Sequence, residues 1–137
     1  MQNIMHKILW IDDEIDALKP HILFLREKSY EITPVSNGED AISLLKESHY
    51  DAILLDVDNG PDGIVRDANY RIYSKTGLGK ARDALRPGGI LAVWSAAPDH
   101  KFTVRLKESG FDVEVREVRA RPNNKGPRHT IWFARKR

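Results

Sequence analysis

The sequence predicts a doubly wound α/β domain, in which a mostly parallel sheet lies between two layers of helices. Continuous apolar runs at residues 7–11, 52–55 and 90–94 are bounded by turn residues, as is typical of strands buried on both faces. Segments with helical spacing of apolar residues separate these runs. The last two strand-like segments, 111–118 and 129–134, are joined by a loop too short for a parallel crossover, which predicts an antiparallel pair.

The expected strands are residues 7–11, 31–35, 52–55, 90–94, 111–118 and 129–134, and the expected helices are about 15–28, 39–47, 76–85 and 99–109. Pro20 lies inside the first helical pattern, which is unfavourable unless the helix starts late or kinks there. Pro34 places the second strand at a sheet edge. The predicted strand order is therefore 2-1-3-4-6-5, with the last strand antiparallel between the fourth and the fifth.

The chain of 137 residues suits one domain, residues 1–137, with one core. It has no cysteine, which excludes disulfides and thiolate metal sites. No apolar run approaches the roughly 18 residues of a membrane span, and no apolar segment follows the N-terminus as in a signal peptide. These features predict a cytoplasmic protein with no membrane partner. Residues 58–75 show no regular pattern, and we expect a long, mobile loop there.

Charge is distributed unevenly along the chain. Residues 1–57 carry 5 Lys and Arg against 11 Asp and Glu, a net of −6, and the remaining residues carry 17 against 9, a net of +8. The basic residues are dispersed through patterned segments, which favours ordinary solvated faces over a nucleic-acid-binding arm. We therefore expect no nucleic-acid partner.

Acidic side chains follow two of the predicted central strands. Asp12 and Asp13 end the first, and Asp56 and Asp58 end the third. In open α/β sheets the ligand crevice lies at the carboxyl ends of the strands, so these four acids are expected to lie together there. Clustered carboxylates repel one another and attract a hard cation, which predicts weak binding of Mg²⁺ or Ca²⁺.

Residues 6–56 resemble a response-regulator receiver domain. The resemblance rests on Lys7-Ile8-Leu9-Trp10-Ile11-Asp12-Asp13-Glu14, Ser36-Asn37-Gly38-Glu39-Asp40-Ala41 and Tyr50-Asp51-Ala52-Ile53-Leu54-Leu55-Asp56. It implies a flavodoxin-like fold in which Asp56 is the phosphoacceptor and the other acids hold a magnesium ion. The Lys-Pro pair that follows the fifth strand of a receiver has no counterpart, so Asp56 is expected to be a vestigial phosphoacceptor.

Residues 50–137 resemble the C-terminal half of a spermidine-synthase-like or S-adenosylmethionine-dependent methyltransferase-like Rossmann protein. The resemblance rests on Leu54-Leu55-Asp56-Val57-Asp58-Asn59-Gly60-Pro61, on Tyr73-Ser74 and on Ala84-Leu85-Arg86-Pro87-Gly88-Gly89-Ile90-Leu91-Ala92-Val93-Trp94-Ser95. In that superfamily a glycine-rich loop follows the first strand and an acid ends the second. Here Asp12-Asp13-Glu14 and Ser36-Asn37 stand at these positions, so the cofactor half of the site is missing.

The two resemblances favour a chimera, in which a receiver-like fragment, residues 1–56, is joined to a methyltransferase-like fragment, residues 57–137. Such a chain would be engineered to test the recombination of fold fragments. We would then expect no enzyme activity, no required cofactor, no partner and a monomer. Two alternatives stay open: a phosphoacceptor receiver of a two-component signalling system, and a remnant S-adenosylmethionine-type transferase.

Overall fold

The computed structural model describes residues 5–57, 67–121 and 125–137. Its strands are β1 His6–Asp12, β2 Tyr30–Val35, β3 Tyr50–Asp56, β4 Leu85–Ser95, β5 Phe111–Arg121 and β6 Lys125–Lys136. Its helices are η1 Ile15–Leu18, α1 Lys19–Glu27, α2 Gly38–Leu45, α3 Asp67–Tyr70, η3 Arg71–Tyr73, α4 Lys75–Ala84 and α5 His100–Glu108. The labels η1 and η3 denote 3₁₀ helices.

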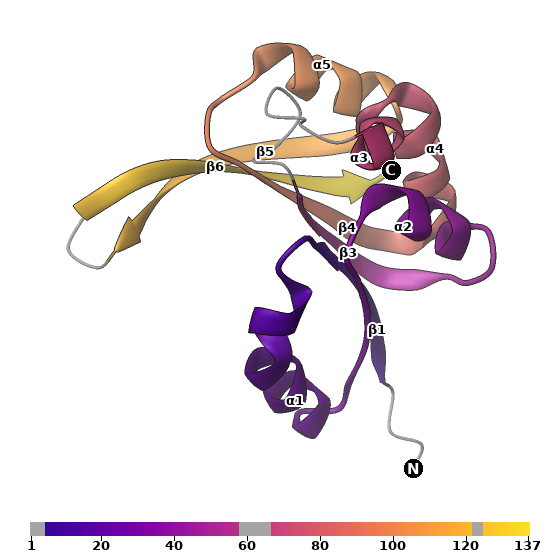
Figure 1. Cartoon of the computed structure of the whole chain (residues 1–137). Coiled ribbons are helices and arrows are strands. Elements are labelled where there is room, and N and C mark those ends of the chain that lie inside the picture. The colour runs from indigo at the N-terminus through magenta and orange to yellow at the C-terminus, as the bar shows by residue number, and fades with distance from the viewer. Residues whose placement is uncertain (1–4, 58–66, 122–124) are drawn as a thin grey trace.

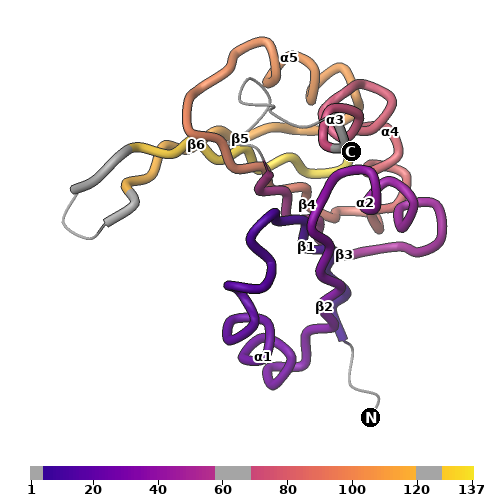
Figure 2. The backbone as a smooth tube through the Cα atoms, viewed as in Figure 1, coloured from indigo at the N-terminus to yellow at the C-terminus, as the bar shows by residue number. Residues whose placement is uncertain are grey.

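All six strands form one sheet in the order β2-β1-β3-β4-β6-β5, which confirms the predicted topology. The pairs β1–β2, β1–β3 and β3–β4 are parallel, and β6 is antiparallel to both β4 and β5. Helices α2, α4 and α5 lie on one face of the sheet, whereas α1 lies on the other, beside β1 and β2 (Figure 1; Figure 2). The two helix layers are therefore very unequal.

The first helical segment begins with a short 3₁₀ helix because of its proline. Residues 15–18 form η1, and α1 starts at Lys19, so that Pro20 occupies the first turn of the α-helix. A proline is tolerated there because the first N–H groups of a helix have no intrahelical acceptor. The helix starts late, as the position of Pro20 requires. Within α1, Ile22 is the buried residue, and Leu23 and Phe24 are exposed.

The segment expected as one long loop is partly helical. Residues 67–73 form α3 and η3, and Ile72 and Tyr73 are buried. The Tyr73 hydroxyl donates a 2.7 Å hydrogen bond to the Val57 carbonyl, and the Gly38 N–H donates a 2.7 Å bond to Oδ1 of the buried Asn69. These contacts fix the segment to the end of β3 and to the start of α2. Residues 58–66, where mobility is also expected, lie outside the described residues.

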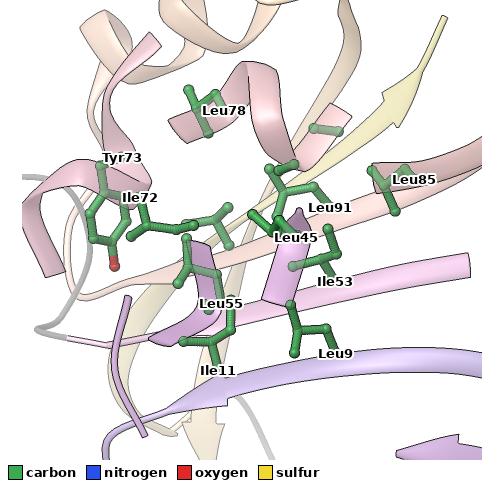
Figure 3. Close-up of a cluster of buried hydrophobic side chains, with 14 of the residues drawn as sticks. Leu9, Ile11, Leu45, Ile53, Leu55, Ile72, Tyr73, Leu78, Leu85 and Leu91 are labelled. Atoms are coloured by element: carbon green, nitrogen blue, oxygen red, sulfur yellow. The ribbon is translucent and has the colours of Figure 1, made fainter. Parts of the chain in front are cut away.

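The main core lies between the sheet and the layer of α2, α4 and α5 (Figure 3). Alternate strand residues, such as Leu9, Ile53 and Leu91, point into it and are fully or almost fully buried. Phe102 of α5 stands edge-on to Trp132 of β6, with ring centroids 5.0 Å apart. Each such side chain contributes about 1.5–3 kcal/mol through burial. No helix in the described ranges has the length and apolar character that crossing a membrane requires.

Candidate functional site at the carboxyl edge of the sheet

The predicted acids of β1 and β3 lie side by side at the carboxyl edge. Asp12 and Asp56 are direct partners in the parallel register of these two strands, so their side chains leave the sheet on the same face. Asp12 is buried and Asp56 is half-buried. Two carboxylates this close, in a partly desolvated position, disfavour each other's ionised form.

The electrostatics of Asp56 differ strongly from those of an ordinary aspartate. Burial, followed by repulsion from Asp12 and Asp13, raises its pKa from 3.8 to about 6, while His129 acts in the opposite direction. The carboxyl group is therefore mostly ionised at pH 7 and takes up a proton about one pH unit lower. A side chain with such a pKa can accept a proton from a ligand near neutrality.

Asp12 has a local structural role as well. Its Oδ1 accepts a 2.8 Å hydrogen bond from the Glu14 N–H, which holds the turn that leads out of β1. Burial nevertheless raises the Asp12 pKa, because the effect of this hydrogen bond is smaller. Asp13 and Glu14 are exposed beside it. The edge thus presents a group of negative charges at the end of β1.

The predicted cation site is only partly within the described ranges. Among the residues that the structure describes, no group of three or more acidic or histidine side chains is arranged to hold a metal ion. Asp58, the fourth acid of the predicted set, lies outside these ranges. Binding of Mg²⁺ or Ca²⁺ by Asp12, Asp13, Asp56 and Asp58 therefore stays a prediction.

Residues from β4 and β6 complete the edge, and the sequence analysis did not assign them to the site. Ser95 and Thr130 are both buried and are partners in the antiparallel β4–β6 register. The Ser95 hydroxyl donates a 2.8 Å hydrogen bond to the Ala97 carbonyl and fixes the turn after β4. His129 precedes Thr130 and influences the charge of Asp56. The antiparallel direction of the last strand, which the sequence does predict, was the available signal that His129 would reach this edge.

The residue that follows the end of β2 and its turn, Asn37, is the N-cap of α2. Asn37 caps α2, because its Oδ1 accepts a 2.9 Å hydrogen bond from the Asp40 N–H. The Asn37 amide also donates a 3.0 Å hydrogen bond to the Asp40 carboxylate. The side chain at this strand end is therefore held by α2.

Comparison with known structures decides between the two resemblances. Human methyltransferase-like protein 13, solved with S-adenosylhomocysteine, matches 98% of this chain and 73% of its own, with a TM-score of 0.66 and 18% identity. The N-methyltransferase NodS from Bradyrhizobium japonicum WM9, also solved with S-adenosylhomocysteine, matches 96% of this chain and 78% of its own (TM-score 0.55, 14% identity). The chain has the methyltransferase fold. The spermidine synthase from Thermotoga maritima shares it, over 96% of this chain and 54% of its own (TM-score 0.61, 16% identity).

The methyltransferase-like fold covers both halves of the chain, including the half that resembles a receiver. The expectation of an engineered chimera without activity is therefore wrong, and nothing supports a receiver segment with Asp56 as phosphoacceptor. The expectations of no enzyme and of no required cofactor are wrong for the same reason, since the matching structures include methyltransferases, two of them with S-adenosylhomocysteine bound. The sequence itself matches no family model, and no curated protein is similar enough to it to count as a relative.

The acidic edge fits one end of an S-adenosylmethionine-type cofactor. The sulfonium and the amino group of that molecule are cationic, and Asp12, Asp13 and Asp56 supply carboxylates. The loop after β1 contains no glycine, and Asn37 stands where an acid for the ribose would be expected. The match is therefore one of charge, at the cationic end.

Proposed function

We propose that the chain is an S-adenosylmethionine-type transferase that binds the cationic part of its cofactor against the carboxylates at the edge of β1 and β3. The carrying observation is the side-by-side placement of Asp12 and Asp56 at the carboxyl edge of a methyltransferase-fold sheet. In open α/β sheets this edge is where ligands bind. When bound, such a cofactor supplies an electrophilic carbon on a positively charged sulfur.

The chain's own residues then have distinct roles. Asp12 is held by its bond to the Glu14 N–H and contributes a fixed negative charge near the cation. Asp56 has a pKa of about 6 and is suited to accept the proton that an amine acceptor loses on transfer. Tyr73, bonded to the Val57 carbonyl, holds the residue that follows Asp56 in place. Since the edge is acidic, an amine is the acceptor class that it favours.

Three related ligands test the proposal by calorimetric titration at pH 7.5. S-adenosylmethionine carries a sulfonium, sinefungin carries an amine at the same position, and S-adenosylhomocysteine has a neutral thioether there. We expect both cationic ligands to bind about tenfold more tightly than the thioether, since one favourable charge contact corresponds to about 1.4 kcal/mol. Equal affinity for all three, or no binding of any of them, would refute the proposal.

A pair of variants assigns the effect to the site. Asp56→Asn should reduce the preference for the cationic ligands and leave the affinity for the thioether almost unchanged. Asp83→Asn, on the exposed end of α4, removes the same charge far from the edge and serves as the control. Transfer itself is measured by the S-adenosylhomocysteine released when a panel of amines is added with S-adenosylmethionine.

A further inference from the structure

In the described part of the chain, the sheet face opposite α2, α4 and α5 is largely uncovered. Helix α1, which follows η1, lies on that side and packs beside β2, and no other described helix covers β3, β4, β6 or β5 there (Figure 1). Four apolar residues of these strands are only half-buried on this face: Leu54, Ile90, Trp94 and Phe133. We call this surface, on β3, β4, β6 and β5, the open face. Contiguous apolar patches that are rimmed by polar residues mark interaction sites.

The strand register shows how charge is arranged around this apolar centre. Leu55 of β3 pairs with Val93 of β4, so the next residues along these strands, Asp56 and Trp94, also lie side by side. Trp94 pairs in turn with Ile131 of β6, and Ile131 pairs with Arg116 of β5. These four side chains form a row across the sheet with an acid at one end and an arginine at the other. The arginine belongs to the same surface, because its guanidinium lies 5.4 Å from the centre of the Phe133 ring.

In the neighbouring row of residues across the sheet, the two central side chains, on β4 and β6, differ in size. Ala92 of β4 pairs with Phe133 of β6, so a small residue stands beside a large one. Ile90 and Phe133 also line a groove of about 430 Å³, whose rim carries Asp112, Glu114, Arg116 and Arg135. Both signs of charge are therefore present along this rim.

We infer that the open face is a self-association surface and that its occupant is a second copy of this chain. A two-fold axis parallel to the strands, between β4 and β6, exchanges β3 with β5 and β4 with β6. It sets the Arg116 side chain opposite the partner's Asp56, twice by symmetry, and sets Phe133 opposite the partner's Ala92. One symmetric arrangement therefore pairs opposite charges and also sets a large side chain against a small one. This complementarity is between the face and itself, which favours a second copy of the chain over an unrelated protein.

Helix α1 is compatible with this packing. Stacked sheets lie about 10 Å apart, and a helix is about 10 Å thick, so the partner's sheet fits in the layer that α1 already occupies. Each α1 then flanks the partner's edge strand β5. The four strands of the open face, at about 4.8 Å spacing and over about five residues, give a footprint of roughly 300 Å², which is small for a stable complex. The dimer is therefore a weak one that forms as concentration rises.

Sedimentation velocity over a range from low micromolar to several hundred micromolar tests this inference. The unmodified chain should shift from monomer to dimer within that range. Arg116→Glu places two like-charged pairs in the interface and should weaken the dimer about a hundredfold, at about tenfold for each pair. Lys101→Glu makes the same charge change on the exposed surface of α5 and should leave the dimer unchanged.

Cross-linking locates the contact. The chain has no cysteine, so Asp56→Cys and Arg116→Cys proteins can be mixed and treated with a short bis-maleimide that spans the distance between stacked sheets. This mixture should yield a covalent dimer, and a mixture of Arg116→Cys with Lys101→Cys should not. A monomer at all concentrations, equal dimerisation of the Arg116→Glu protein, or equal cross-linking of both mixtures would overturn the inference. Since the partner's Arg116 and a cationic ligand would both use Asp56, such a ligand should favour the monomer.

Discussion

Replacing Asp56 by asparagine should stabilise the protein at neutral pH. The folded state raises the pKa of this carboxyl from 3.8 to about 6, mainly through burial and then through Asp12 and Asp13. The folded chain therefore holds the proton more tightly than the unfolded chain does. Stability contributed by the protonated form is fully present below about pH 4 and is lost as the pH rises through about 6.

The size of the effect follows from these two pKa values. The difference between about 6 and 3.8 corresponds to about 3 kcal/mol at 1.36 kcal/mol per pH unit. Because the carboxyl group is only half-buried, solvent screening reduces this to about 1.5 kcal/mol. For 137 residues, at about 2.1 cal/mol/K each, the entropy of unfolding is about 0.29 kcal/mol/K, so the shift in Tm is about 5 °C.

Urea unfolding of the unmodified protein and of Asp56→Asn, at pH 4.5 and at pH 7.5, measures the effect. The unmodified protein should lose stability relative to the variant between these pH values, so that most of the gap seen at pH 7.5 is closed at pH 4.5. Asp83→Asn, exposed on α4, is the control for loss of one negative charge. An Asp56→Asn protein no more stable than the unmodified one at pH 7.5, or a gap that does not change with pH, would refute the reasoning.

Three further substitutions test the framework around the site, each by urea unfolding. Tyr73→Phe removes the hydroxyl that bonds the Val57 carbonyl and should cost about 1–2 kcal/mol, since a buried acceptor loses its partner; a neutral result would mean that water replaces the bond. Phe102→Ala empties a fully buried position and should cost about 3–5 kcal/mol, and a loss below about 1 kcal/mol would contradict the packing. Gly110→Ala should cost at least about 1 kcal/mol, because φ is +98° and the added methyl group meets the Arg82 side chain; unchanged stability would show that both strains relax.

The sheet could be predicted from the sequence because local pattern and global fold agree. The continuous apolar runs of β1, β3 and β4 occupy the interior of the sheet, and Pro34 lies in the edge strand β2. Strand β5, in which apolar and polar residues alternate, forms the other edge. The late start of α1 also follows from one residue, Pro20. In each case a single local property, such as the missing N–H group of a proline or the alternation of apolar and polar residues, allows the segment only one position in the fold.

The helical segment at residues 67–73 could not be predicted in the same way. The segment consists of two short helices, and residues far away in the sequence hold it in place. Tyr73 donates a hydrogen bond to the Val57 carbonyl after β3, and Asn69 accepts one from the Gly38 N–H at the start of α2. Local spacing carries no sign of such contacts. His129 is a different case, because its position at the acidic edge follows from the antiparallel direction of β6, which the sequence does predict.

The mistaken interpretation as a chimera has a physical origin. Acids at the ends of buried parallel strands and a polar cap after β2 meet requirements that doubly wound folds share, so short motifs such as Asp12-Asp13-Glu14 do not distinguish one such fold from another. The order of all six strands, with β6 antiparallel between β4 and β5, is a stricter criterion. It involves the whole chain, and it matches the methyltransferase fold.

The acid pair itself couples stability to binding. Asp12 and Asp56 lie in register, and burial raises the pKa of both, so their joint ionisation at neutral pH opposes folding. A cation placed between them relieves that repulsion, and a ligand that binds only the folded state stabilises it by RT ln(1 + [L]/Kd). Binding must then lower the pKa of Asp56, so cationic ligands should bind more tightly as the pH rises through about 6 and release protons below it. A sheet edge that is unfavourable when empty and is relieved by positive charge is what a site for a sulfonium or an amine requires.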